Sequence, residues 1–209
     1  MKRLRLVGDI HGDVEEYLKI VKDSEQSIQV GDYGMGFEDF GDVPKEHRFI
    51  RGNHDSPWHC RKNSNWIPDG SIETIGEHLF MFCGGARSID QHYRVEGVSW
   101  WRDEELSQKD LMVVADNFEK YQPEIMITHD APEGITNMLY RKFVEEVPPI
   151  TRVAFDWMFS KHKPKLWFHG HWHQSRDVTI EGCRFITLDI NEYCDLDLKT
   201  LEIVERGFK

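Results

Sequence analysis

The sequence has few cysteines, no long apolar run and no excess of positive charge. Its four cysteines are Cys60, Cys83, Cys183 and Cys194. They form no Cys-x-x-Cys pair, and their spacing indicates no disulfide framework. No apolar stretch approaches the roughly 20 residues of a membrane-spanning helix, and Gly8 and Asp9 interrupt the short apolar segment near the N-terminus. We therefore expect a cytoplasmic protein with reduced thiols, no signal peptide and no membrane partner.

The charge balance excludes some classes of partner. The chain has 37 acidic and 26 basic residues, which gives a formal net charge of -11. Proteins that coat nucleic acid need a basic surface, so we expect no stable nucleic-acid partner, and a nuclease fits poorly. A small phosphorylated ligand held through bound cations remains compatible with this charge, because such ions can outweigh the local protein charge.

The 209 residues contain no internal repeat, low-complexity tract or linker rich in proline, glycine and serine. A single domain over residues 1–209 is the simplest prediction. The apolar patterns predict strands at 3–8, 27–32, 47–55, 123–129 and 165–173, helices at 14–23, 107–121 and 151–162, and hairpins at 71–85, 176–189 and 196–205. Ser107 and Thr151 are the expected helix caps. The opening strand–helix–strand–strand order favours a parallel sheet with a crossover helix.

Five of these strands end in a polar cluster. The clusters are Asp9-x-His11, Gly31-Asp32, Asn53-His54-Asp55, His129-Asp130 and His171-x-His173. In an open α/β sheet, ligands bind beyond the carboxyl ends of the strands. We therefore expect these five clusters, distant in sequence, to meet in space.

The side chains of the clusters combine two carboxylates, four imidazoles and one amide oxygen. The candidate metal ligands are Asp9, His11, Asp32, Asn53, His129, His171 and His173. Such a mixed set suits manganese, iron, nickel or zinc better than magnesium or calcium, which prefer oxygen ligands alone. Seven ligands exceed the need of one ion, so we expect two divalent transition-metal ions, with manganese as the first candidate. Two ions roughly 3.5–4 Å apart are a common device for hydrolysing phosphate esters.

His54 is the imidazole left over from this ligand set. The leaving oxygen of a phosphate ester needs a proton, and His54 is the candidate donor because its neighbour Asn53 already serves as a ligand. Asp55 is the candidate partner that holds the His54 ring and favours its charged form.

The stretches GDIHG, VGDYG, RGNHD, THDAP and HGHWH resemble the five ordered motifs of the calcineurin-like metallophosphoesterases. The long loop GGARSIDQHYRVEGVSWW, residues 84–101, resembles stretches in small bacterial and phage members of that superfamily. The resemblance covers residues 9–173. It implies a first metal held by Asp9, His11, Asp32 and His173, and a second held by Asp32, Asn53, His129 and His171, with Asp32 bridging. It also implies an α/β fold in which helices flank a β-sandwich of two mixed sheets, in place of the simple open sheet.

The chain departs from the serine/threonine protein phosphatases of that superfamily. Those enzymes carry an arginine shortly after the second motif, in the pattern G-D-x-V-D-R-G, whereas this chain has GDYGMG there. They also typically have glutamate where this chain has Asp55. We expect Arg87 or Arg94, in the long loop after Gly85, to supply the missing cation to the phosphate.

These observations predict dinuclear metal-dependent hydrolysis of a small phosphate ester. Phosphodiesters, including cyclic phosphates and nucleotides, are slightly favoured because a diester carries less charge and needs the missing arginine less. The alternative is a phosphomonoesterase such as a protein or nucleotide phosphatase. A binding scaffold without catalysis is less favoured, since every ligand position is present. His169 lies one residue ahead of the last motif's glycine, and we expect it to be structural or to support a ligand.

Overall fold

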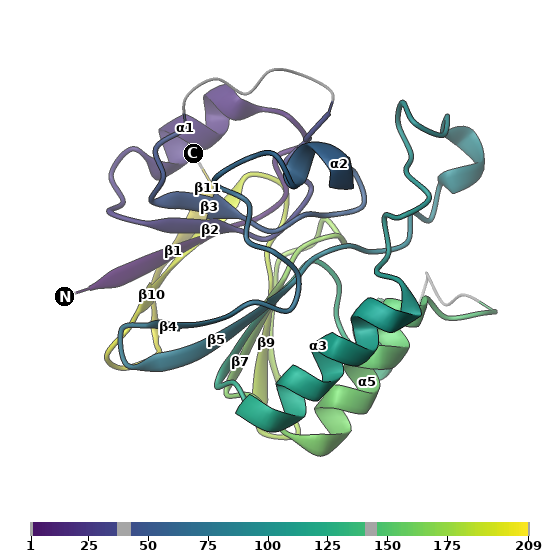
Figure 1. Ribbon diagram of the computed structural model, residues 1–209. Coiled ribbons are helices and arrows are strands. Elements are labelled where there is room, and N and C mark those ends of the chain that lie inside the picture. The colour runs from purple at the N-terminus through teal and green to yellow at the C-terminus, as the bar shows by residue number, and fades with distance from the viewer. Residues whose placement is uncertain (1, 37–42, 141–145, 209) are drawn as a thin grey trace.

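The computed structural model describes residues 2–36, 43–140 and 146–208, and its strands form two mixed sheets (Figure 1). The first sheet has the order β11-β10-β1-β2-β3, from β1 (Arg3–Val7), β2 (Ser27–Gln29), β3 (His47–Phe49), β10 (Glu192–Asp197) and β11 (Ile203–Phe208). The second has the order β4-β5-β6-β7-β9-β8, from β4 (Ile72–Ile75), β5 (His78–Cys83), β6 (Ile125–Thr128), β7 (Leu166–His169), β8 (Arg176–Ile180) and β9 (Cys183–Thr187).

Each sheet combines a group of parallel strands with antiparallel ones. Strands β1, β2 and β3 run parallel, as do β5, β6, β7 and β9. Hairpin partners add β4, β8 and β11 at sheet edges, and β10 pairs antiparallel with β1. The expected sandwich of two mixed sheets is confirmed, and the strand–helix–strand–strand opening forms the parallel part of the first sheet.

Helices cover the outer faces of the sandwich. The helices of the described residues are α1 (Val14–Val21), α2 (Pro57–Cys60), α3 (Gln108–Tyr121), α4 (Glu133–Leu139) and α5 (Ile150–Lys161), with a 3₁₀ turn η1 (Gln91–Tyr93) in the segment between β5 and α3. Helix α1 lies against the first sheet, and α3 and α5 lie side by side against the second (Figure 1). None of the helices in the described ranges is long and apolar enough to span a membrane.

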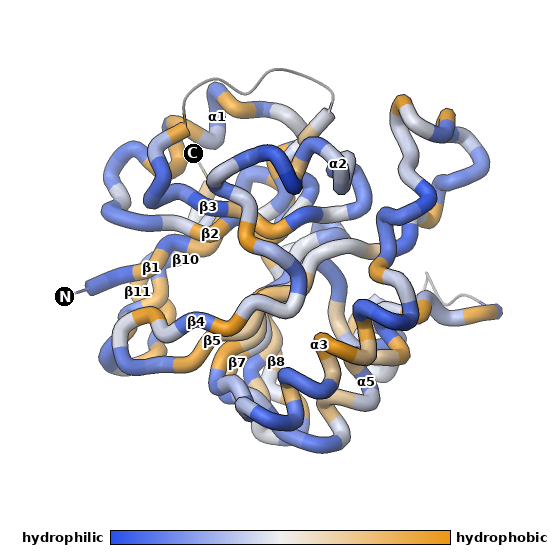
Figure 2. Tube along the Cα trace, in the orientation of Figure 1, coloured by the Kyte–Doolittle hydropathy of each residue, from blue (hydrophilic) through white to orange (hydrophobic). Residues whose placement is uncertain are grey.

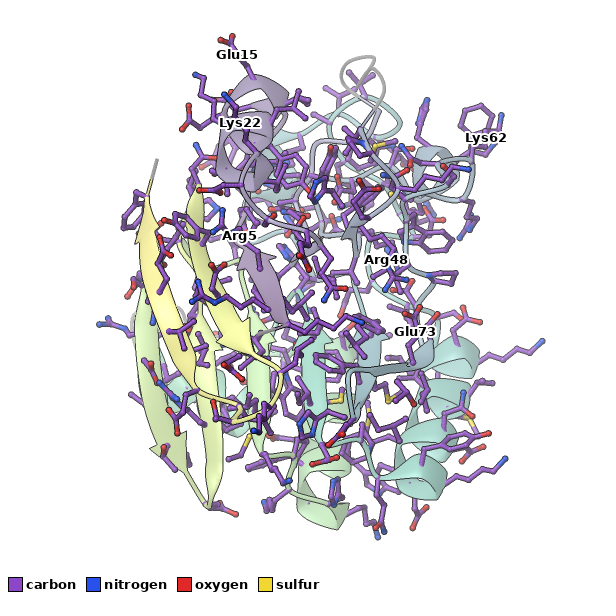
Figure 3. The ribbon with its side chains drawn as sticks, turned by 90° about the vertical axis from the view of Figure 1, so that its left-hand side faces the viewer. Arg5, Glu15, Lys22, Arg48, Lys62 and Glu73 are labelled. Atoms are coloured by element: carbon purple, nitrogen blue, oxygen red, sulfur yellow. The ribbon has the colours of Figure 1, made fainter. Side chains whose placement is uncertain are left out.

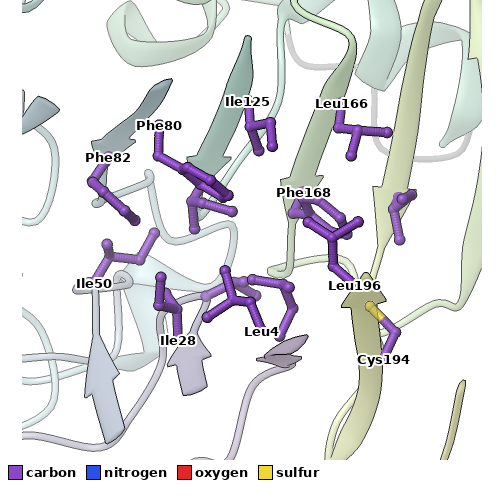
Figure 4. Packing of buried hydrophobic residues seen from close by; sticks show 14 of the residues in the cluster. Leu4, Ile28, Ile50, Phe80, Phe82, Ile125, Leu166, Phe168, Cys194 and Leu196 are labelled. Carbon is purple, nitrogen blue, oxygen red and sulfur yellow. The ribbon is translucent and has the colours of Figure 1, made fainter. Parts of the chain in front are cut away.

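The period of two along the strands builds the core between the sheets. Leu4 and Leu6 of β1 face inward with Phe80 and Phe82 of β5, while Met81 of β5 faces α3 and α5. Figure 4 shows the inward side chains of both sheets meeting in one layer. The apolar positions accordingly concentrate along the central strands in Figure 2.

An ion pair joins the edges of the two sheets. Arg48 of β3 donates two hydrogen bonds, of 2.9 and 2.7 Å, to the carboxylate of Glu73 on β4, and both side chains are labelled in Figure 3. This bidentate geometry fixes the relative position of the two edges.

The helix caps were predicted with mixed success. The Ser107 hydroxyl accepts a hydrogen bond of 3.2 Å from the backbone nitrogen of Asp110, so the predicted cap of α3 is confirmed. The predicted cap at Thr151 is wrong, because α5 begins at Ile150 with Pro149 preceding it. Proline has a backbone angle suited to a helix start, and it places Thr151 inside the first turn.

Candidate metal centre

The turns that follow five strands bring the polar clusters together, as predicted. Strands β1, β2 and β3 lead to the first three clusters, and β6 and β7 lead to the last two. One ligand atom from each of Asp9, His11, Asp32 and His173 lies within 4.8 Å of the others. A second group with the same spacing comprises Asp32, His129 and His171. Asp32 belongs to both groups.

Asn53 lies beside the second group. Its side-chain oxygen is 3.1 Å from Nε2 of His129 and 2.9 Å from Nδ1 of His171. The amide oxygen therefore points toward the same place as the two imidazoles. These three residues, together with Asp32, are the four ligands that the resemblance implies for the second metal.

Four of the candidate ligands have a strained backbone. His11, Asp32, His171 and His173 have φ angles of 45°, 57°, 67° and 47°. Residues other than glycine avoid this left-handed region, and such strain concentrates at functional sites, where the surrounding structure holds it. This backbone conformation directs the four side chains toward one another, and an ordinary turn would not need four such residues to converge.

Two motif glycines are needed because the backbone passes directly against a carboxylate. A Cβ atom on Gly52 would overlap Oδ1 of Asp32, and one on Gly170 would overlap Oδ1 of Asp9. Residues that follow these glycines in the same motifs hold the carboxylates in place: the backbone nitrogen of His54 donates to Asp32 over 2.7 Å, and that of His171 donates to Asp9 over 3.0 Å. Each motif thus positions a ligand of another motif.

The electrostatics of the centre favour a bound cation. Burial alone would raise the pKa of Asp32, but His129 and the neighbouring imidazoles hold it well below its usual range. Burial alone would lower the pKa of His129, but Asp32 and then Asp9 raise it to about 10. Two fully buried carboxylates therefore attract positive charge to this point, and a metal ion can replace the proton there.

The imidazoles present suitable atoms to such an ion. Nδ1 of His129 donates a hydrogen bond of 2.9 Å to the carbonyl of Val30, which leaves Nε2 facing Asp32. Burial lowers the pKa of His171 to about 3, so its ring is neutral and able to ligate. The mixed carboxylate, imidazole and amide donors therefore fit divalent transition-metal ions.

A pocket of about 370 Å³ opens onto the centre. It is lined by Asp32, Asn53, His54, Ile89, Asp90, Arg94, His171, Trp172 and His173. Arg94 reaches it from the segment between β5 and α3, which extends away from the sheets in Figure 1. The Arg94 guanidinium lies 3.0 Å from Nδ1 and 2.6 Å from Nε2 of His54, and it forms a bidentate ion pair with Asp90. Burial lowers the pKa of His54, and Arg94 acts in the same direction.

The carboxylate of Asp55 is not paired with the His54 ring, contrary to the prediction from the sequence. Its fully buried carboxylate accepts hydrogen bonds from the backbone nitrogens of Tyr33, Gly34, Met35 and Gly52. These four donors occupy both carboxylate oxygens, so the predicted pairing of Asp55 with the His54 ring is corrected. Asp55 instead shapes the turn that follows Asp32.

Two further sequence candidates are also separate from the pocket. Arg87 donates to the carbonyl of Val147 and is not among the described residues that line the pocket, so its predicted substrate contact stays a prediction. His169 is fully buried, and its Nε2 lies 3.1 Å from the hydroxyl of Thr187. These contacts agree with the predicted structural role.

Sequence reasoning missed several residues that support the centre. Ser88 and Glu104 form a hydrogen-bonded chain behind Asn53. Arg152 forms a buried ion pair of 2.5 Å with Asp130, the residue after His129. Ser88, Glu104 and Arg152 come from segments without a recognisable motif, so no sequence pattern indicated them. Asp90 and Arg94, which form an ion pair, are opposite charges four residues apart, and this spacing was visible in the sequence.

Comparison with known proteins agrees with this geometry. The family model described as calcineurin-like phosphoesterase matches residues 2–175. The chain belongs to the calcineurin-like phosphoesterase family. Members of the family are metal-dependent hydrolases of phosphate esters, and the Asp and His side chains of this chain form groups that could hold a metal ion. A search of curated proteins finds no match.

Solved structures share the fold at low sequence identity. A candidate 5′-nucleotidase from Staphylococcus aureus, solved with alpha-ketoglutarate, is 12% identical with a TM-score of 0.52, covering 98% of this chain and 53% of that one. GAP50, the anchor in the inner membrane complex of Plasmodium, is 8% identical with a TM-score of 0.50, covering 100% and 89%. An archaeal phosphodiesterase is 12% identical with a TM-score of 0.48, covering 98% of each chain. At these identities, the likeness to the first two structures shows the fold alone.

Proposed function

We propose that this member of the calcineurin-like phosphoesterase family is a dinuclear metal-dependent phosphodiesterase that acts on a small substrate. The observation that carries the proposal is the position of Asp32, whose carboxylate belongs to both groups of candidate ligands. A single buried carboxylate shared by two ligand groups is the arrangement that two closely spaced ions need.

The proposed ligands divide between two ions. Asp9, His11, Asp32 and His173 hold the first, and Asp32, Asn53, His129 and His171 hold the second. When bound, the ions supply Lewis acidity toward the phosphoryl oxygens and an acidified water as nucleophile, and we expect manganese to serve.

Two pocket residues act on the substrate in this proposal. Arg94 donates to a phosphoryl oxygen, and His54 gives a proton to the leaving oxygen. Although burial and Arg94 favour the neutral form of His54, an anionic phosphate bound beside the ring acts in the opposite direction and favours its protonated form.

The charge of the pocket supports a diester over a monoester. Outside the proposed metal ligands and His54, the charged residues among the described residues that line the pocket are Arg94 and Asp90. They form an ion pair with contacts of 2.6 and 2.8 Å, so their formal charges cancel. A monoester dianion needs more positive charge than this pair offers, whereas a diester monoanion needs less.

A substrate comparison tests the proposal. Metal-free protein is reconstituted with Mn(II), and rates are measured on bis(p-nitrophenyl) phosphate, p-nitrophenyl phosphate and 2′,3′- and 3′,5′-cyclic nucleotides. We expect hydrolysis that depends on Mn(II), with a higher kcat/KM for the diesters. A higher kcat/KM for the monoester would assign the protein as a phosphomonoesterase, and binding without turnover would assign it as a scaffold. A cytoplasmic location stays a prediction, supported by four buried free thiols.

A further inference from the structure

A buried chain of hydrogen bonds lies behind the proposed second metal site. Nδ2 of Asn53 donates to the hydroxyl of Ser88 over 3.0 Å. That hydroxyl donates to one carboxylate oxygen of Glu104 over 2.6 Å, and the backbone nitrogen of Ser88 donates to the other over 2.8 Å. Asn53, Ser88 and Glu104 are 3%, 4% and 3% exposed, so water does not replace these partners.

Glu104 sets the direction in which the hydrogen bonds of this series are donated. An ionised carboxylate only accepts hydrogen bonds, so the hydroxyl proton of Ser88 has to point toward Glu104. The lone pairs of that hydroxyl then face Asn53 and require an N–H donor. The amide group of Asn53 consequently presents its nitrogen to Ser88 and its oxygen to His129 and His171.

This direction matters because the two ends of an amide have nearly the same shape. If the side chain of Asn53 turned by 180°, its NH₂ group would face His129 and His171, and an amide NH₂ group is not a metal ligand. The neutral imidazole of His171 does not specify the amide orientation by itself, since its ring nitrogen can donate or accept. Glu104 and Ser88 supply a specification from the other end of the amide.

We propose that Glu104 and Ser88 are positioning residues that set the orientation of the Asn53 amide and thereby the affinity of the second metal site. The inference rests on the proposed function, because it requires Asn53 to be a metal ligand. Ser88 and Glu104 both lie between β5 and α3, the segment that also carries Arg94. One loop therefore presents Arg94 to the pocket and orients a ligand of the metal centre.

The substitution Glu104→Gln tests the direction with almost no change in shape. The backbone N–H of Ser88 cannot reverse, so it retains the oxygen of the new amide, and the NH₂ group then faces the Ser88 hydroxyl. That hydroxyl turns its proton toward Asn53 and favours the flipped amide. We expect the affinity of the second ion to fall about 10–100-fold while the first ion is unaffected. Ser88→Ala removes the hydroxyl that accepts from Asn53, so neither orientation of the Asn53 amide is favoured from that end. We expect a smaller loss of affinity, confined to the same metal site.

The neighbouring Glu105 provides a matched control. Its carboxylate accepts a hydrogen bond of 3.1 Å from the backbone nitrogen of Thr151, away from Asn53. Glu105→Gln makes the same chemical change one residue along the chain, and we expect both metal affinities to stay at the wild-type values. Thermal unfolding of each metal-free variant shows whether it is folded before metal is added.

The measurement is a titration of metal-free protein with Mn(II), in which free Mn(II) is followed by electron paramagnetic resonance. The inference would be supported if the wild type binds two ions and Glu104→Gln lowers the affinity of one site while the affinity of the other is unchanged. Two unchanged sites in a folded Glu104→Gln variant would overturn it and leave the proposed function standing. One site or none in the wild type would overturn both. If Glu104→Gln does not fold, Ser88→Ala decides, and unchanged affinities there would overturn the inference.

Discussion

The indole nitrogen of Trp172 donates a hydrogen bond of 2.9 Å to Oδ1 of Asp130. Trp172 lies between the candidate ligands His171 and His173, and its ring stacks on Tyr140 at a centroid distance of 4.3 Å. The same Asp130 forms a buried ion pair with Arg152. The turn after β7 is therefore anchored to the turn after β6 by a side chain that is not itself a ligand.

Trp172→Phe is expected to loosen this anchor. Phenylalanine keeps the stack on Tyr140 but leaves the buried Asp130 carboxylate without one donor, which costs about 1–3 kcal/mol of unfolding free energy. Urea unfolding of the metal-free protein measures the loss. Trp157→Phe on the exposed side of α5 is the control and should cost less. An equal loss in both variants would show that the hydrogen bond to Asp130 adds little.

Arg94→Ala is expected to raise KM for a phosphodiester about 10–100-fold, because a charge-assisted hydrogen bond is worth about 1.5–3 kcal/mol. Arg102→Ala is the control, since Arg102 is exposed and pairs with Glu96. Arg87→Ala is measured beside them. A rise in KM for Arg87→Ala and not for Arg94→Ala would assign the phosphate contact to the other arginine of the loop.

His54→Ala is expected to slow hydrolysis about 10²–10⁴-fold on substrates with an alkoxide leaving group, such as a cyclic nucleotide. Bis(p-nitrophenyl) phosphate should be affected less, because p-nitrophenolate leaves readily without a proton. Metal content should stay at the wild-type value, whereas His171→Ala should lose metal and activity together. An equal slowing of both substrate types would rule out proton donation and indicate that His54 orients or stabilises the phosphate.

The buried His169 predicts how stability depends on pH. Burial lowers its pKa from 6.5 to about 4, so the unfolded chain takes up a proton between these values and the folded chain does not. Unfolding free energy of the metal-free protein should therefore fall as the pH drops from about 6.5 to about 4, by up to about 3 kcal/mol from this residue. His169→Gln should flatten that slope relative to the exposed control His92→Gln. Parallel curves for the two variants would contradict this assignment.

The candidate ligands could be predicted from the sequence because of where their motifs lie. Each motif directly follows a strand, and parallel strands of a sheet end at a common edge. The short apolar strands before Asp9, Asp32 and His129 were recognisable from composition alone. The sandwich of two sheets was not recognisable in that way, since strand pairing between distant segments leaves no local period. That part of the fold was predicted only because the motifs resemble those of the calcineurin-like metallophosphoesterases.

The supporting contacts could not be predicted for a different reason. Adjacency in sequence suggested that Asp55 holds the His54 ring, but successive side chains in a turn point in different directions, and Asp55 points to the backbone after Asp32. Glu104 and Asn53 are 51 positions apart and communicate through Ser88, which no periodicity connects to either. Such pairs depend on how loops pack, and loops carry little regular pattern.

Activity as a function of metal equivalents tests the central claim most directly. Metal-free protein at a concentration well above both dissociation constants is titrated with Mn(II), and the initial rate on bis(p-nitrophenyl) phosphate is measured at each step. The shared position of Asp32 predicts a rate that rises until two equivalents are bound and is constant thereafter. A constant rate from one equivalent onward, or hydrolysis that does not depend on metal, would contradict a dinuclear centre.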